Sequence, residues 1–156
     1  MKIHFTFVIS LFLFCSGEMT EWPTHTLCNV GNFKAFYKSC DPLQDFGVTL
    51  SPCSYITQDI KLRFGLLLRH NLNELFLNIK AHVNGQFFID YDYTICESSA
   101  PRFSFCGRKK GEFIQIDHPI SPHIPYFPKG EFNVSLELVN EDQKLIGCAN
   151  LTVFNM

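Results

Sequence analysis

The residues in this sequence best placed to do chemistry are two cysteines ten positions apart. Cys96 and Cys106 enclose a short loop, and apolar runs typical of β-strands lie on either side of it. A cluster of three basic residues, 108–110, follows directly between two glycines. This spacing predicts a disulfide that closes a turn at one end of a β-sheet, with positive charge beside it.

The first residues read as a targeting segment. Lys2 supplies a positive start, residues 3–14 are almost all apolar, and residues 15–17 are small enough for a cleavage site. This pattern predicts a secretory signal peptide over residues 1–17, since the apolar run is too short to cross a bilayer. A membrane anchor is the alternative. The mature chain, residues 18–156, has the length of a single domain.

Secretion makes the remaining cysteines candidates for disulfides. Of seven cysteines, Cys15 falls in the signal peptide, which leaves an even number in the mature chain. Six cysteines in an oxidising compartment predict three disulfides, but they allow 15 pairings. Cys96 with Cys106 is the simplest local pair. A zinc site is the alternative, and the absence of any C-x₂-C spacing argues against it. The six are Cys28, Cys40, Cys53, Cys96, Cys106 and Cys148.

The sequence carries no recognisable catalytic motif. His118 and His123 lie in a proline-rich stretch that makes a poor metal site, and Asp90 and Asp92 have the spacing of solvated residues on one strand face. The mature chain has 12 basic and 15 acidic residues, so no nucleic-acid partner is expected. We therefore expect a binding protein, not an enzyme, with no cofactor and no metal.

Period-two alternation of apolar and polar residues dominates the mature chain. Asn84-Gly85 between two alternating runs predicts a β-hairpin, because a type I′ turn needs residues that tolerate positive φ. Segment 22–28 reads as an irregular entry, and 117–130, with four prolines, cannot be a central strand. No helical period stands out, so an all-β sandwich or cup is expected. The expected strands are 33–37, 46–50, 60–68, 74–83, 86–95, 113–116, 131–138 and 147–153.

Two glycosylation sequons fall on the polar faces of expected strands. Asn133-Val-Ser135 alternates with apolar neighbours, and Asn150-Leu-Thr152 does the same in the last strand. A glycan requires its asparagine in water, so both Asn133 and Asn150 should face away from the apolar interior.

Aromatic residues are unusually frequent. The mature chain holds 13 Phe, 5 Tyr and one Trp, and packing in an ordinary core accounts for most of them. It accounts less well for Ile120, Ile124, Tyr126 and Phe127, which lie in the proline-rich stretch. A loop of this kind can form the lip of an apolar pocket.

Several longer motifs resemble the ML lipid-recognition family. They are Cys40-Asp-Pro-Leu-Gln-Asp-Phe-Gly47, Arg63-Phe-Gly65, Glu74-Leu-Phe-Leu77 and Phe103-Ser-Phe-Cys-Gly-Arg-Lys-Lys-Gly-Glu112. The resemblance covers essentially all of the mature chain, including the spacing of the six cysteines. It implies an immunoglobulin-like β-sandwich or cup, in which two antiparallel sheets are splayed apart around a lipid cavity.

The resemblance also implies particular residues. The disulfides would be Cys28–Cys53, Cys40–Cys148 and Cys96–Cys106. The lipid-binding lining, carried over by strand position, would be Phe46, Val48, Leu50, Leu62, Phe64, Leu75, Leu77, Ile79, Ile95, Phe105, Phe127, Leu136 and Leu151. Alternation alone would be equally consistent with a filled core at these positions.

The function that the resemblance implies is that of a secreted lipid-binding co-receptor. It would associate at the cell surface with a leucine-rich-repeat ectodomain of the Toll-like class, the radioprotective receptor of B cells, and regulate innate responses to lipopolysaccharide. A soluble lipid or sterol carrier without a receptor is the alternative. The endotoxin-binding relative has lysines on its lip, where this chain keeps only Lys129. A phospholipid or another lightly charged lipid is therefore expected in place of a doubly phosphorylated head group, although lipid A-like acyl chains would also fit.

Overall fold

A computed structural model describes residues 21–53, 59–120 and 128–156 of the chain. The predicted signal peptide, residues 1–17, lies outside the described residues, and so do the expected lip residues Ile124, Tyr126 and Phe127.

The described residues form nine strands and no helix. The first strands are β1 His25–Val30, β2 Phe33–Ser39, β3 Gly47–Ser51 and β4 Ile60–Leu67. The later strands are β5 Leu75–Val83, β6 Gln86–Cys96, β7 Phe113–Ile120, β8 Gly130–Asn140 and β9 Leu145–Asn155. No helix in this described part is long and apolar enough to cross a membrane.

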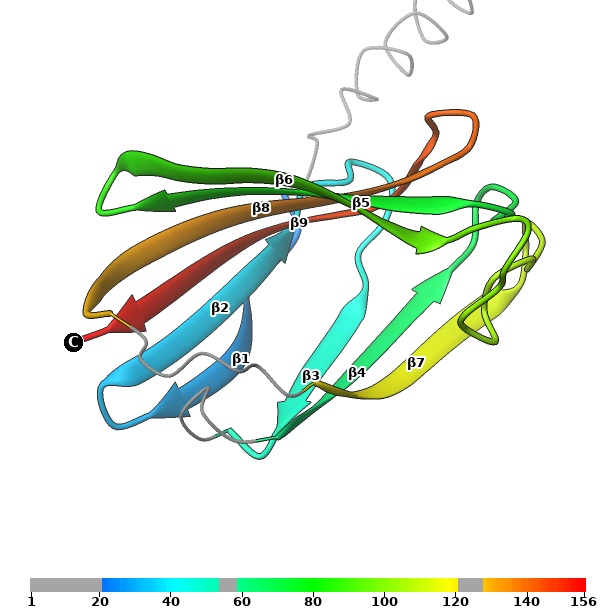
Figure 1. Cartoon of the computed structure of the whole chain (residues 1–156). Helices are drawn as coiled ribbons and strands as arrows, with labels where there is room; N and C mark the ends of the chain where they lie inside the picture. Colours follow the sequence, from blue (N-terminus) through cyan, green and yellow to red (C-terminus); the bar gives the residue numbers. More distant parts are fainter. Residues whose placement is uncertain (1–20, 54–58, 121–127) are drawn as a thin grey trace, which may run out of the picture.

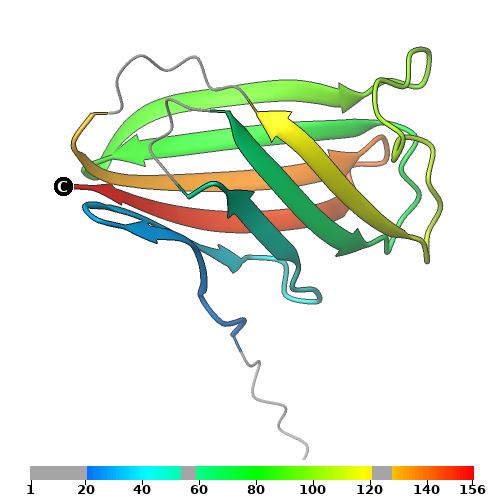
Figure 2. The same ribbon diagram turned by 90° about the horizontal axis from the view of Figure 1, so that it is seen from below.

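The strands make two antiparallel sheets that face each other. The large sheet has the order β1-β2-β9-β8-β5-β6, and the small sheet has the order β3-β4-β7. Figures 1 and 2 show the small sheet lying across one face of the large one. The expected all-β sandwich or cup is confirmed, including the hairpin at Asn84-Gly85, where both residues have positive φ.

Two segments differ from the sequence-based expectation. Segment 22–28 is expected to be irregular, but most of it belongs to β1, which pairs with β2 through a register shift between Thr26 and Cys28. Strand β7 also runs four residues further than expected and includes Pro119. A proline is tolerated there because β7 is the edge strand of the small sheet, where one side of the backbone needs no partner.

Three disulfides tie the sheets and loops together, with the pairing that the family resemblance implied. Cys28 on β1 joins Cys53 after β3, which closes one side of the cup. Cys40–Cys148 links the connection after β2 to β9, and Cys96–Cys106 closes the loop after β6.

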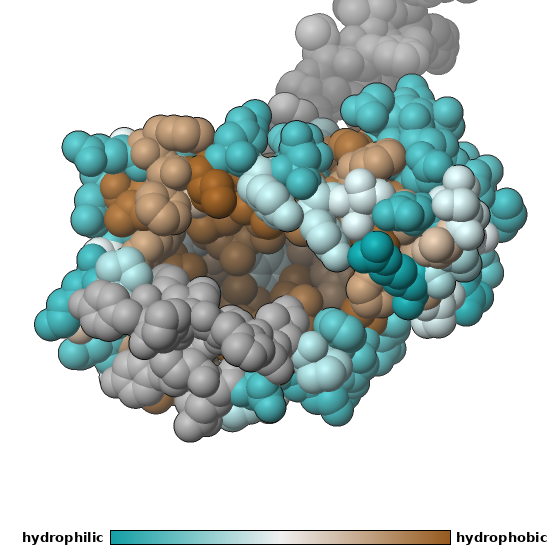
Figure 3. Space-filling view, viewed as in Figure 1, coloured by the Kyte–Doolittle hydropathy of each residue, from teal (hydrophilic) through white to brown (hydrophobic). Residues whose placement is uncertain are grey.

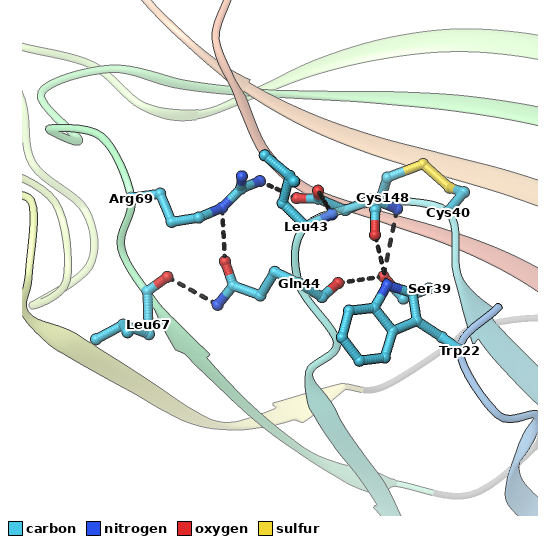
Figure 4. A network of polar contacts seen from close by, with 9 residues as sticks. Trp22, Ser39, Cys40, Leu43, Gln44, Leu67, Arg69 and Cys148 are labelled. Carbon is cyan, nitrogen blue, oxygen red and sulfur yellow. Dashed lines mark hydrogen bonds and ion pairs between the residues drawn. A yellow bond between two sulfur atoms is a disulfide. The ribbon is translucent and has the colours of Figure 1, made fainter. Parts of the chain in front are cut away.

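A polar network fixes the connection between the two sheets (Figure 4). Asp41 is almost fully buried and forms an ion pair with Arg69, which follows β4. Arg69 also donates to the Gln44 side chain at 3.0 Å, and Gln44 donates to the Leu67 carbonyl at 2.9 Å. The Trp22 indole donates to the Asp41 carbonyl at 2.7 Å. The Asp41 side chain is thus paired, as a buried charge requires, and the network anchors the segment that leads into β3.

Candidate functional site

The inner faces of the two sheets do not close on each other along their whole length. They enclose a cavity of about 280 Å³, and the described residues of its wall expose only apolar surface. Figure 3 shows a hollow with hydrophobic residues on its visible interior. None of the described residues that line the cavity carries a charge.

Strand alternation explains how both sheets supply the wall. On β3 and β4, every second residue points inward, and Val48 pairs with Phe64 as Leu50 pairs with Leu62. On the large sheet, Leu136 on β8 lies beside Ala149 on β9. Because successive side chains alternate between faces, the intervening residues Thr49, Lys61 and Arg63 are turned to solvent.

The structure brings eleven of the thirteen expected lining residues to the cavity wall. They are Phe46, Val48, Leu50, Leu62, Phe64, Leu75, Leu77, Ile95, Phe105, Leu136 and Leu151. Ile79 is half-buried on β5 but does not line the cavity, because it lies two residues nearer the β5–β6 hairpin. Phe127 lies outside the described residues.

The cavity wall also contains ten residues that were not expected there from the sequence. Leu66 and Leu138 stood on the expected apolar faces, so alternation could have found them. Leu27 was missed because its segment was expected to be irregular. The ten are Leu27, Tyr37, Leu66, Ile114, Ile116, Leu138, Ile146, Gly147, Cys148 and Ala149.

The cavity wall differs between its two ends. Near the Cys96–Cys106 loop, the side chains of Leu66, Leu75 and Ile114 are buried and belong to the main packed core. Leu62 and Leu77, further along the wall, keep part of their surface open. Apolar surface held open inside a fold loses the contacts and the exclusion of water that a filled core would give. This part of the wall therefore suits an apolar guest.

The long open side of the cup lies between two edge strands. β6 ends the large sheet and β7 ends the small sheet. The inner row of β6 continues from Ile95 to Tyr93 and Tyr91, opposite Leu77 and Ile79 on β5. These tyrosines are exposed, so the apolar wall passes into an amphipathic rim with phenolic hydroxyls.

The charged side chains on the described strands of the small sheet lie on its outer face. Asp117 on β7 accepts a hydrogen bond from Arg63 at 3.0 Å, and Lys61 lies 3.5 Å away. The hydrogen bond from Arg63 lowers the pKa of Asp117, and the nearby Lys61 charge adds to this effect. Asp117 pairs with both cations on the solvent face, and the inner face is left for apolar contacts.

The described lining of the cavity suits the binding of an apolar molecule. No cluster of three or more His, Cys, Asp or Glu side chains that could hold a metal occurs among the described residues. The chemistry available to the cavity is the burial of hydrocarbon, which gains about 0.8 kcal/mol per methylene.

Comparison with known proteins gives a consistent set of relatives. Lymphocyte antigen 86 of Mus musculus is 44% identical over 138 residues, which span 88% of this chain and 85% of that protein. Lymphocyte antigen 86 of Homo sapiens is 40% identical over 156 residues, spanning 94% of this chain and 96% of that protein. The crystal structure of chicken MD-1 complexed with lipid IVa matches with a TM-score of 0.80 and 37% identity, covering 86% of this chain and 99% of that one. No family model matches the chain.

Proposed function

The chain belongs to the lymphocyte antigen 86 family of ML lipid-recognition proteins, and from that premise we propose that it is a lipid-binding co-receptor in the innate response to lipopolysaccharide. The observation that carries the proposal is the cavity between the two sheets, whose described lining residues are uncharged and expose only apolar surface. Chicken MD-1, which shares this fold, has been crystallised with lipid IVa. No residue is assigned a catalytic role.

The wall of the cavity selects for hydrocarbon and leaves the head group outside. An acyl chain meets only apolar side chains, so each methylene that enters is removed from water at no polar cost. At the rim, the inner row of β6 carries the hydroxyls of Tyr91 and Tyr93, and none of its described residues is a lysine or an arginine. The guest is therefore a lightly charged lipid such as a phospholipid, or the acyl part of a lipid A-like molecule.

The protein acts outside the cell in this proposal. Residues 1–17 are the signal peptide, residues 18–156 form the single mature domain, and three disulfides suit an oxidising compartment. The partner is a leucine-rich-repeat ectodomain of the Toll-like class, the radioprotective receptor of B cells, which holds the protein at the cell surface. Family membership supports this partner.

Lipid extraction tests the binding function. The secreted protein, purified without detergent, is expected to release acyl lipid into organic solvent, and mass spectrometry identifies the lipid. A protein that releases no lipid and takes up no fluorescent acyl lipid would contradict the proposal, because its cavity would then be an unused void.

Co-purification tests the receptor. Co-expression with the receptor ectodomain is expected to give a complex that survives size-exclusion chromatography. A lipid-loaded protein that never co-elutes with the ectodomain would instead be a soluble lipid or sterol carrier.

A further inference from the structure

The strongest unassigned feature of the described surface is a group of exposed, largely apolar side chains on both faces of β6. Phe87 and Phe88 are 64% and 70% exposed, and they lie on β6 just after the Asn84-Gly85 turn. Ile89, Tyr91 and Tyr93 are also exposed. We call these five residues the rim patch. Exposed apolar groups at this density mark an interaction site.

The rim patch lies at the hairpin end of the cup, on the edge strand β6 that borders its open side. Pairing places Val83 beside Phe132, next to the start of β8, while Leu75 and Cys96 lie at the opposite end. Figures 1 and 2 both show the β5–β6 hairpin at the same end of the molecule as the C-terminus, away from the Cys96–Cys106 loop. The C-terminal Met156 adds another exposed apolar side chain at that end.

A bulge makes the hairpin apolar on both of its faces. The register shifts between Ala81 and His82, so that Ala81 pairs with Ile89 and His82 pairs with Phe87. Phe88 is the extra residue. Ile89 thus lies on the inner face, whereas the Phe87 ring packs edge-on against His82 on the outer face, with their centroids 5.8 Å apart. A lipid layer can surround both faces of this projection at once.

The hairpin is held firmly. The Asn84 backbone donates to the Glu131 carbonyl at 2.8 Å, and the Asn84 side chain accepts from the Glu131 backbone at 3.0 Å. Gly130 packs so closely on Asn84 that a β-carbon there would lie 2.8 Å from the amide oxygen. Lys129 directly precedes Gly130 in the chain and is exposed, and a cationic residue at this point of the sequence suits a lipid phosphate.

The inner row of the rim patch continues the cavity wall. From Leu77 on the wall, β5 and β6 present the pairs Leu77–Tyr93, Ile79–Tyr91 and Ala81–Ile89 in order toward the hairpin. A hydrocarbon chain that leaves the cavity along this row keeps apolar contact up to the end of the cup.

We propose that the rim patch docks the hairpin end of the cup onto a phospholipid surface, where Phe87 and Phe88 enter the acyl layer and lipid passes between the surface and the cavity. This proposal rests on the proposed lipid-binding function and adds the source from which the lipid is taken. Aromatic residues suit this position because they favour the boundary between hydrocarbon and head groups.

Flotation with phosphatidylcholine vesicles tests the docking. The wild-type secreted protein is expected to float with the vesicles. Phe87→Ser/Phe88→Ser should lower the partition coefficient by about a hundredfold or more, since each ring that is fully buried contributes about a tenfold factor or more. The matched control is Leu67→Ser/Phe113→Ser. These two residues are 50% and 63% exposed on the outer face of the small sheet, so flotation should not change.

A second measurement looks for contact between the rim patch and the lipid directly, by fluorescence quenching. Phe88→Trp in the otherwise unchanged protein should give tryptophan fluorescence that brominated phosphatidylcholine quenches, whereas the native Trp22 fluorescence should not be quenched. Leu77→Arg, which we expect to lose lipid uptake, should still float, and this separates docking from the cavity function.

Three results would overturn the proposal. They are equal flotation of wild type and Phe87→Ser/Phe88→Ser, no additional quenching by brominated lipid in the Phe88→Trp variant, and a wild-type dimer in sedimentation that the double serine variant cannot form. The last result would make a second copy of the chain the occupant of the rim patch.

Discussion

The Tyr37 hydroxyl accepts a hydrogen bond from the backbone N–H of Val48 at 3.1 Å. Tyr37 belongs to β2 of the large sheet and Val48 to β3 of the small sheet, so this contact crosses between the two walls of the cup. The same hydroxyl donates to the Phe46 carbonyl at 2.9 Å. One side chain therefore sets where the small sheet begins relative to the large one.

Removing that hydroxyl should loosen the attachment of β3. Tyr37→Phe keeps the ring in the cavity wall but leaves the Val48 N–H and the Phe46 carbonyl without this partner. We expect the free energy of unfolding to fall by about 1–2 kcal/mol, measured by urea denaturation. Tyr93→Phe, at an exposed tyrosine, is the control and should change stability by less than about 0.5 kcal/mol. Equal losses in the two variants would contradict the bridging role.

The same tyrosine should make stability depend on alkaline pH. Burial raises the pKa of Tyr37 above its ordinary value of 10.0, and the Asp45 charge adds to this effect against the hydrogen bond from Val48. The unfolded chain then loses its phenolic proton first, so the free energy of unfolding falls as pH rises above 10.0. Below pH 10.0 the phenol keeps its proton in both the folded and the unfolded chain, so the stabilisation by Tyr37 is fully present. Denaturation between about pH 9 and about pH 11 should show a steeper decline for wild type than for Tyr37→Phe.

Much of the cavity wall follows from local sequence, and the rest depends on long-range pairing. Leu62 and Phe64 could be assigned because an extended chain turns every second side chain to the same face. Leu27 could not, since β1 gains its regular hydrogen bonds only by pairing with β2. The bulge that turns Phe87 outward has no signal in the alternation. That the sheets stand apart was implied only by family resemblance, because alternation is also consistent with a packed core.

The disulfides should contribute unequally to stability. Cys96–Cys106 closes a loop with a sequence separation of 10, and Cys40–Cys148 one of 108. Each disulfide lowers the conformational entropy of the unfolded chain, and this predicts contributions to the free energy of unfolding of about 3 kcal/mol for the first and about 5 kcal/mol for the second. Urea denaturation of the two double-serine variants measures the difference. Titration of the denatured, unreduced mature protein should find no free thiol, and two free thiols would contradict the pairing.

Asn133 and Asn150 are expected to carry glycans. Both are exposed on the outer face of the large sheet, and their sequons interlock across β8 and β9. The Thr152 hydroxyl donates to the Asn133 amide oxygen at 3.2 Å, and the Ser135 hydroxyl donates to that of Asn150 at 3.0 Å. These bonds occupy both hydroxyls in the fold, so each glycan should be added before the strands pair. Mass spectrometry of the secreted protein decides occupancy, and an unmodified Asn133 would contradict the prediction.

The sharpest test of the cavity places a charge on its wall. Leu77 lines the cavity from β5, and Leu77→Arg would set a cation among apolar side chains with no charged partner. A lipid chain of about 14 methylenes gains on the order of 10 kcal/mol from burial before the costs of binding are subtracted. We expect Leu77→Arg to lose this binding. The variant should still be secreted, because the open side of the cup lets the arginine side chain bend outward.

The matched control for Leu77→Arg is Asn78→Arg, on the opposite face of the same strand. There the new cation lies beside Asp92 and Glu137, so fold and lipid uptake should both be retained. Uptake of a fluorescent acyl lipid, measured on both secreted variants, separates the outcomes. Because a packed core has no room for a buried arginine, failure of Leu77→Arg to be secreted would indicate a filled interior. Secreted Leu77→Arg that binds lipid as well as wild type would place the acyl chain elsewhere.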